Sequence, residues 1–313
     1  MKCVTSLKKG ESLRDTLKII EGYSDIIVMR HFIEGAAKFA TEVLSHPVIN
    51  AGDGANEHPS QTLLDLYTIR EELGGLENLK IAFVGDLKYG RTVHSLVKAM
   101  KHFKPQFYFV APDSIQIPED VLEDLKECGI DYSIHERYED IVAEVDVLYM
   151  TRIQRERFEN IEEYNMVSGV YKVSAKDIVG KTKENMIILH PLPRVDEIAL
   201  DVDELPQAKY FKQAKNGVPV RQAMYKIALK FLENSKRVED FEGAKNTEKV
   251  ENTLENSKRL EDLKGVENIE KVENTGSKVV CKNKKCITHF EKTGNGIIRK
   301  NGKKYCYYCG KEI

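Results

Sequence analysis

The stretch KIAFVGDLKYGRT, residues 80–92, has the pattern of a short apolar strand, a glycine-containing loop and the start of a helix. The same alternation of apolar runs and helical patterns extends over residues 12–235. We predict strands at 25–29, 48–51, 80–85, 107–111, 146–150 and 186–189, and helices at 36–44, 61–73, 92–102, 118–127 and 220–234. Short buried strands that alternate with helices are typical of parallel sheets with crossover helices. The sequence therefore predicts an α/β fold with two parallel-sheet domains, divided by the helix at 61–73.

Composition and charge indicate which partners and which cellular compartment are plausible. The chain has 313 residues, 41% hydrophobic and 31% charged, with a net charge of −2, which does not favour a nucleic-acid or membrane partner. No run approaches the roughly 18 apolar residues of a membrane span. The first residues, MKCVTSLKKGES, have no apolar core of a signal peptide. We therefore predict a cytoplasmic protein.

A tandem repeat changes the composition after residue 231. Residues 232–253 and 254–275 are identical at 16 of 22 positions, and both copies are rich in charge. In the second copy, apolar residues recur every three positions, which on an α-helix drifts around the axis and leaves no single apolar face. We predict a solvated linker over residues 236–276, with an ordered helix as the alternative.

Four of the six cysteines lie in the last 33 residues, with the spacing C-x4-C-x19-C-x2-C. Each short pair can bring two thiolates to one metal ion, and a hairpin in the long gap can bring the pairs together. The four ligands, Cys281, Cys286, Cys306 and Cys309, would complete a tetrahedral site with no open position. The spacing therefore predicts one structural zinc per chain in a small domain at 277–313. His289 is nearby, and we interpret it as a packing or surface residue.

Groups suited to small anions follow several of the predicted strands. In an open parallel sheet, residues beyond the carboxyl ends of the strands line the ligand crevice. The loop 85–92 also opens a helix, as anion-binding loops do, but it has Arg91 where a nucleotide-binding P-loop has lysine. The groups are Arg30, His31, residues 56–61, Arg91, Arg152, Gln154, Arg157 and residues 190–194. Together they predict a site for two small anionic ligands, without a catalytic thiol, an acidic pair or a metal.

Five stretches resemble the catalytic chain of the aspartate transcarbamoylases. They are VMRHF (28–32), NAGDGANEHPSQTLLDLYTI (50–69), VGDLKYGRTVHSL (84–96), AEVDVLYMTRIQRERF (143–158) and ILHPLPRVDEIA (188–199). The resemblance extends from about Thr5 to Phe231, and GDLKYGRTVHSL and the TRIQ stretch distinguish it from the ornithine enzymes. Residues 281–313 resemble the zinc domain of the regulatory chain of the same enzyme. The resemblance implies transfer of a carbamoyl group from carbamoyl phosphate to L-aspartate in pyrimidine synthesis.

The resemblance also implies roles for individual residues. Carbamoyl phosphate would contact Arg30, His58, Gln61, Leu192 and Pro193, with Arg30 and His58 as the catalytic pair. Aspartate would contact Lys9, Arg91, Arg152 and Gln154. Ser6 and Lys9 would lie on a loop that reaches into a neighbouring subunit, which implies a homo-oligomer. No organic cofactor is implied.

The same resemblance gives the expected domains and one departure from the family. We expect a carbamoyl-phosphate domain at 1–74, completed by the helix at 220–235, and an aspartate domain at 75–219. Family catalytic chains carry a Ser-Thr-Arg-Thr-Arg phosphate loop in an earlier N-terminal segment, and the 313 residues contain no such motif. We therefore expect a truncated first domain and weak activity of this chain alone. The alternatives are a non-catalytic assembly or regulatory subunit, or a gene remnant.

Overall fold

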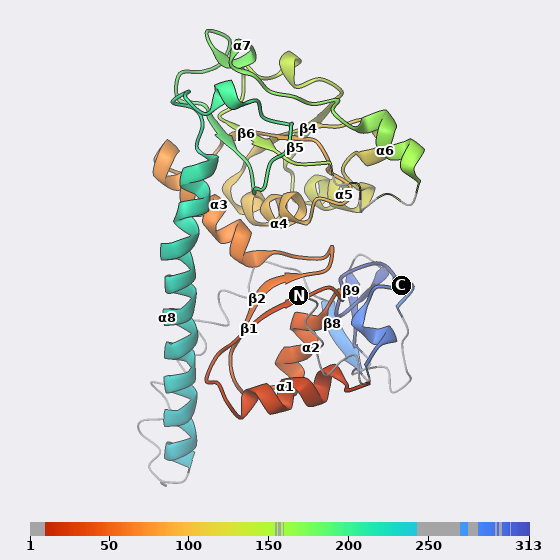
Figure 1. Ribbon diagram of the computed structural model, residues 1–313. Helices are drawn as coiled ribbons and strands as arrows, with labels where there is room; N and C mark the ends of the chain where they lie inside the picture. Colours follow the sequence, from red (N-terminus) through yellow and green to blue (C-terminus); the bar gives the residue numbers. More distant parts are fainter. Residues whose placement is uncertain are drawn as a thin grey trace. The chain divides into compact units, whose positions relative to one another are not determined.

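The described part of the chain forms two compact units. A computed structural model describes residues 10–153, 155, 158, 160–242, 270–274, 281–291, 293, 296–300 and 302–313 (Figure 1). Unit 1 comprises residues 1–56 and 222–313, and unit 2 comprises residues 57–221. Each unit is described by itself below.

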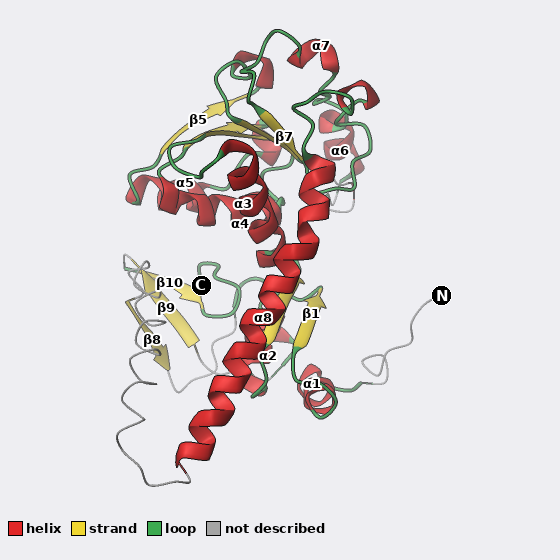
Figure 2. Ribbon diagram, turned by 90° about the vertical axis from the view of Figure 1, so that its left-hand side faces the viewer, coloured by secondary structure: helices red, strands yellow, loops and turns green. Residues whose placement is uncertain are grey.

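Unit 2 is built on a five-stranded parallel sheet with the strand order β5-β4-β3-β6-β7. Figure 2 shows its edge strands β5 and β7 in yellow. The strands are β3 (Lys80–Val84), β4 (Gln106–Val110), β5 (Asp131–His135), β6 (Val147–Met150) and β7 (Ile187–Leu189). Its helices are α3 (Pro59–Leu73), α4 (Arg91–Met100), α5 (Glu119–Glu127), α6 (Ile161–Val167), α7 (Ala175–Ile178) and the first part of α8 (Tyr210–Glu242). Short 3-10 helices cover 101–103, 113–115, 138–140 and 200–202. The crossover helices between parallel strands confirm the predicted α/β fold.

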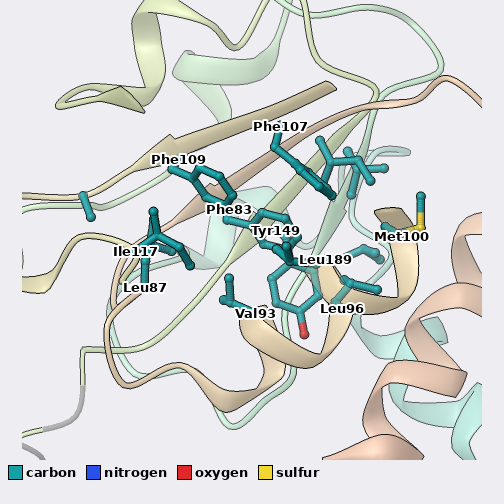
Figure 3. Close-up of a cluster of buried hydrophobic side chains, with 14 of the residues drawn as sticks. Phe83, Leu87, Val93, Leu96, Met100, Phe107, Phe109, Ile117, Tyr149 and Leu189 are labelled. Carbon is teal, nitrogen blue, oxygen red and sulfur yellow. The ribbon is translucent and has the colours of Figure 1, made fainter. Parts of the chain in front are cut away.

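Two hydrophobic cores cover the two faces of this sheet. On β3, Ile81 and Phe83 belong to one cluster, and Ala82 and Val84 belong to the other. This alternation follows from the two-residue period of a β-strand. Figure 3 shows Phe83 beside Phe107, Phe109 and Tyr149 in the first cluster. Because both faces of the sheet are packed, the carboxyl ends of its strands are held in position.

Unit 1 contains a two-stranded parallel sheet of β1 (Ile27–His31) and β2 (Val48–Asp53), with helices α1 (Leu13–Glu21) and α2 (Ala36–Val43). It also holds the antiparallel strands β8 (Glu270–Asn274), β9 (Gly296–Lys300) and β10 (Lys303–Cys306), and a 3-10 turn at 287–289. Ser12 caps α1, because its hydroxyl accepts a hydrogen bond from the backbone N–H of Asp15 at 3.0 Å.

Several elements differ from the sequence-based prediction, and helices α1, α6 and α7 were not predicted. Strand β5 was not predicted, because its residues DYSIH form an edge strand with little burial and no apolar run. Helix α8 begins ten residues earlier than predicted and continues to Glu242. The predicted linker 236–276 is therefore helical at its start, and Glu270–Asn274 within it form strand β8. Residues 243–269, which hold most of the repeat, lie outside the described residues. No helix among the described residues is long and apolar enough to cross a membrane.

Candidate functional site

The loop after β3 forms the first part of the candidate site in unit 2. Gly85 has a φ of +116°, and a Cβ there would lie 2.5 Å from the carbonyl oxygen of Thr151. A Cβ on Gly90 would lie 2.4 Å from the carbonyl oxygen of Asp86, so both positions require glycine. The Asp86 carboxylate accepts a hydrogen bond from the backbone N–H of Tyr89 at 2.9 Å. This tight loop places the half-buried Arg91 at the first position of α4.

Arg152 follows the carboxyl end of the neighbouring strand, β6, at the same edge of the sheet. The backbone N–H and the hydroxyl of Thr151 both donate to the carbonyl oxygen of Val84, at 2.8 and 2.9 Å. Strands β3 and β6 are paired in parallel, with Val84 opposite Met150. Arg91 and Arg152 therefore follow the carboxyl ends of adjacent strands, where ligand crevices of parallel sheets form. Both arginines are half-buried, and both already interact with other parts of the chain.

The loop after β7 is held in place by the buried His190. The ring Nδ1 of His190 lies 2.8 Å from the backbone N–H of Leu192, which can only donate. Nδ1 is therefore the acceptor, and Nε2 carries the proton that it donates to Glu197 at 2.7 Å. Burial raises the pKa of Glu197, but hydrogen bonds from His190 and from the backbone lower it to about 2. His190 thus orients the loop that presents Leu192 and Pro193.

Arg194 fixes the other end of this loop. Its guanidinium group forms a two-point ion pair with Asp203, with an Nη2–Oδ2 distance of 2.6 Å. It also lies over the ring of Tyr210, 5.2 Å from the centroid. The Asp203 hydrogen bond, followed by charge interactions with Tyr210 and Asp203, raises the pKa of Arg194. We interpret Arg194, which the sequence grouped with the anion-suited residues, as a structural anchor.

His58 and Gln61 lie in the first turn of α3. His58 is the N-cap residue, and Pro59 takes the first helical position, where its missing N–H costs nothing. The backbone N–H of His58 donates to the hydroxyl of Ser95 on α4 at 3.2 Å, so the starts of the two helices are joined. Gln61 is 9% exposed, and its Nε2 donates to the carboxyl group of Asp65 at 2.8 Å.

Among the described residues that are predicted to bind the substrates, Arg30 lies in unit 1. It occupies an exposed position near the end of β1. The next residue, His31, stacks on Phe32, with 4.7 Å between ring centroids. Burial lowers the pKa of His31, and nearby Asp53 partly offsets this effect. Ser6, Lys9 and Gln154, and Arg157 of the anion-suited groups, lie outside the described residues.

The four cysteines of unit 1 form one buried cluster. Their sulfur atoms all lie within 4.8 Å of one another, with 3.6 Å between Cys281 and Cys309 and 3.7 Å between Cys286 and Cys306. A disulfide would require about 2.05 Å. A tetrahedral metal with sulfur bonds of about 2.3 Å has sulfur–sulfur edges of about 3.8 Å. The donor set and its spacing therefore fit a metal ion with four thiolate ligands. His289 donates from Nε2 to the carbonyl oxygen of Cys281 at 2.6 Å, a packing role as predicted.

The cysteine cluster packs on the start of α2 through the buried Glu34. The Glu34 carboxylate accepts hydrogen bonds from the side chains of Asn283 at 2.7 Å and Lys311 at 2.9 Å. Its backbone carbonyl accepts from the N–H of Ile287 at 2.9 Å. Gly35 follows with a φ of +82°, and a Cβ there would lie 2.7 Å from the Cβ of Tyr308. The cysteine cluster therefore belongs to the core of unit 1, together with α1 and α2.

Comparison with known proteins identifies the family. The carbamoyl-phosphate-binding domain model of the aspartate/ornithine carbamoyltransferases matches residues 1–71, and their aspartate/ornithine-binding domain model matches residues 77–227. The aspartate carbamoyltransferase catalytic subunit of Brachyspira hyodysenteriae is 53% identical over 309 residues, which cover 99% of this chain and 78% of that protein. The chain belongs to the aspartate/ornithine carbamoyltransferase family.

Other members of this carbamoyltransferase family match a shorter part of the chain. The catalytic subunit from Methanocaldococcus jannaschii is 54% identical, over 76% of this chain and 74% of its own length. A solved structure of the M. jannaschii catalytic subunit is similar with a TM-score of 0.68 and 55% identity, over 73% of this chain and 74% of that one. The aspartate transcarbamoylase of Trypanosoma cruzi, solved in complex with N-(phosphonacetyl)-L-aspartic acid, has a TM-score of 0.67 and 40% identity, over 72% of each chain.

Within the described residues, sequence reasoning missed the polar network behind Gln61. It joins Asp65, Tyr149, Gln213 and the backbone of His190. The available signal was Asp65 itself, because a charged residue one helical turn after Gln61 falls on the side of α3 that also carries Ile69 and Leu64. A buried carboxyl group requires partners, and these come from strands and helices that are distant in sequence.

Proposed function

We propose that the chain acts as an aspartate carbamoyltransferase, which converts carbamoyl phosphate and L-aspartate to N-carbamoyl-L-aspartate and phosphate. The observation that carries this proposal is the placement of Arg91 and Arg152 after adjacent parallel strands, in a chain of this family. Two guanidinium groups at one edge suit a dicarboxylate such as aspartate. The side-chain amine of ornithine would meet like charge there.

The chemistry needs binding and charge stabilisation more than covalent catalysis. The amine of aspartate attacks the carbonyl carbon of carbamoyl phosphate, a tetrahedral oxyanion develops, and phosphate leaves as the C–O bond breaks. We assign Arg30 and His58 to stabilisation of the developing negative charge. Leu192 and Pro193 would present backbone groups to carbamoyl phosphate, while Lys9 and Gln154 would assist Arg91 and Arg152 with aspartate. Ser6 and Lys9 would act from a neighbouring subunit in a homo-oligomer.

The experiment that tests the aspartate site compares two arginines three positions apart. Arg152→Leu should raise the KM for aspartate about 10- to 100-fold, because hydrogen bonds to charged groups contribute about 1.5–3 kcal/mol each. Arg155→Leu is the matched control, since Arg155 is exposed and has no assigned contact with substrate. An unchanged KM in Arg152→Leu, or an equal rise in both variants, would remove Arg152 from the site.

For the cysteine cluster, we infer one structural zinc per chain in a domain of the regulatory-chain type. Four buried thiolates with no open position suit zinc, which would supply folding free energy rather than catalysis. The match to the B. hyodysenteriae relative covers 99% of the chain and so extends into this tail, which supports a fused arrangement shared with that protein. We propose no organic cofactor.

We also propose a division into domains, a pathway and a cellular compartment. We place the carbamoyl-phosphate domain at 1–74, completed by the helix at 220–235, and the aspartate domain at 75–219. The two family-model ranges, 1–71 and 77–227, support this division. We further propose a zinc domain at 277–313, pyrimidine synthesis as the pathway and the cytoplasm as the compartment.

A further inference from the structure

The carboxyl group of Asp65 is a buried group of unit 2 that the proposed chemistry leaves without a role. It lies in α3, one turn after Gln61, and is completely buried. It accepts hydrogen bonds from Gln61 Nε2 at 2.8 Å, Gln213 Nε2 at 2.6 Å and the Tyr149 hydroxyl at 2.9 Å. In Figure 3 this hydroxyl points away from Phe83. Burying a carboxyl group at such a position costs free energy, which its hydrogen bonds have to offset.

The backbone N–H of His190 fixes the orientation of the Gln213 amide in this network. The backbone N–H of His190 can only donate, and it donates to Gln213 Oε1 at 2.8 Å. The amide nitrogen of Gln213 must therefore face Asp65 Oδ1 and donate to it. The same oxygen atom then accepts from the amide nitrogen of Gln61. Asp65 Oδ1, which accepts from both glutamines, thus holds the Gln61 amide with its nitrogen toward Asp65.

With one N–H of Gln61 directed to Asp65, the acceptor that remains for a ligand is the carbonyl oxygen of Gln61, beside its second N–H. No described residue donates a hydrogen bond to that oxygen, and it is not a buried unpaired atom. A carbonyl oxygen accepts hydrogen bonds, so it complements the NH2 group of a carbamoyl moiety. The carbonyl oxygen cannot donate a hydrogen bond to a phosphate oxygen. If the amide were turned around, its NH2 group would face the carbamoyl NH2, and donor would meet donor.

We propose that Asp65 is a positioning residue that makes the site selective for the carbamoyl group, by holding Gln61 with its carbonyl oxygen toward the ligand. This inference rests on the proposed function, because it takes Gln61 as a contact of carbamoyl phosphate. A purely structural role for Asp65 would affect stability but would not distinguish ligands with an NH2 group from ligands without one.

The test measures binding of two stable probes to the full 313-residue chain by calorimetry. Phosphonoacetamide carries the phosphonate and the amide NH2, and methylphosphonate carries the phosphonate alone. Wild-type chain should prefer phosphonoacetamide. Asp65→Ala should weaken phosphonoacetamide binding about tenfold, the effect of one lost hydrogen bond of ordinary strength, and leave methylphosphonate binding unchanged.

Two variants serve as matched controls. Asp65→Asn should keep the preference, because its oxygen can accept from both glutamines while its NH2 group donates to the Tyr149 hydroxyl. Tyr149→Phe removes a hydrogen bond to the other carboxyl oxygen, Oδ2, and should also keep the preference. Loss of the preference in Asp65→Asn would overturn the inference, as would an Asp65→Ala chain that still prefers phosphonoacetamide.

A measurement on the wild-type chain covers the case in which Asp65→Ala does not fold. The 13C chemical shift of the Gln61 side-chain carbonyl should move when phosphonoacetamide binds and stay unchanged with methylphosphonate. A shift of the Gln61 NH2 protons alone would show the opposite amide orientation and overturn the inference. Wild-type chain that binds both probes equally would count against the proposed carbamoyl-phosphate site itself, and the inference would fail with it.

Discussion

The sheets of the two units obtain their stability from different sources. The five-stranded sheet of unit 2 is covered on both faces by clusters that contain large side chains such as Phe83, Phe107 and Tyr149. The two-stranded sheet of unit 1 shares its cluster with Cys281, Cys286, Cys306 and Cys309. A small core buries little apolar surface, and a metal ion bound by four thiolates would supply folding free energy to it. Unit 2 should therefore fold on apolar packing, and unit 1 should depend on a metal.

The predicted site residues are unevenly divided between the two units. Arg91, Arg152 and the Gln61 network all belong to unit 2, where they rest on the sheet and on buried hydrogen bonds. Unit 1 supplies Arg30 among the described site residues. A variant that disturbs one unit should therefore leave the other as an internal reference.

The largest expected effect is loss of the metal from unit 1. Structural zinc sites in small domains contribute about 10–16 kcal/mol of apparent binding free energy. Cys306→Ser combined with Cys309→Ser should abolish the one zinc per chain and remove amide-exchange protection from α1 and α2, while β3 and β6 stay protected. Metal analysis and hydrogen exchange would measure both. The control is Cys128→Ser, since Cys128 is an exposed cysteine outside the cluster. Stoichiometric zinc in the double variant would exclude this site.

The converse variant disturbs the sheet of unit 2. Phe83 is fully buried between other aromatic rings, 5.5 Å from Tyr149 between centroids. Phe83→Ala should destabilise unit 2 by about 3–5 kcal/mol, the cost of such a cavity. Zinc content should remain at about one per chain, as expected for a closed four-ligand site. Loss of zinc in this variant would show that the two cores do not depend on separate sources of stability.

A kinetic prediction tests the functional side of the comparison. The 313 residues contain no Ser-Thr-Arg-Thr-Arg phosphate loop. Removing one preorganised transition-state donor costs about 100- to 1,000-fold in kcat. A polypeptide of these residues should therefore be at least about 100-fold slower than the M. jannaschii catalytic subunit, and a segment carrying the loop, added in trans, should raise its rate. Equal rates without the added segment would contradict the role given to that loop.

Measured per pH unit, the smallest expected effect is a pH dependence of the stability of unit 2. Burial raises the pKa of Asp65 to about 7, from an ordinary value of 3.8. Between these values the unfolded chain has lost the proton while the folded chain retains it, so stability should fall as pH rises from 4 to 7. The slope is at most about 1.4 kcal/mol per pH unit. Asp65→Asn should lack this component, as measured by amide exchange in β6. A pH dependence identical in the variant would assign it to another group.

The sequence predicted what depends on local pattern. Strands β3, β4 and β6 lie within a residue or two of their predicted positions, because each is an apolar run bounded by turn residues. The cysteine cluster followed from spacing alone. Edge strand β5 and the full extent of α8 escaped prediction because neither has a decisive pattern of its own.

Contacts between residues distant in the chain could not be predicted from the sequence. The contacts of Asp65 with Gln213, and of Glu34 with Lys311, join residues more than a hundred positions apart, and no periodicity indicates them. For the same reason Gln61 was predicted from resemblance as a ligand contact, while the network that orients it was not. The roles of Ser6, Lys9 and Gln154 stay predictions.

The central claim is that this chain transfers a carbamoyl group to aspartate, and competition between two amine acceptors tests it most directly. Purified, mass-verified chain would be given carbamoyl phosphate with equal concentrations of L-aspartate and L-ornithine, and both carbamoylated products would be quantified. The account predicts that N-carbamoyl-L-aspartate forms faster, and that Arg152→Leu reduces this product selectively because it removes a cation from the dicarboxylate site. Faster carbamoylation of ornithine would contradict the account.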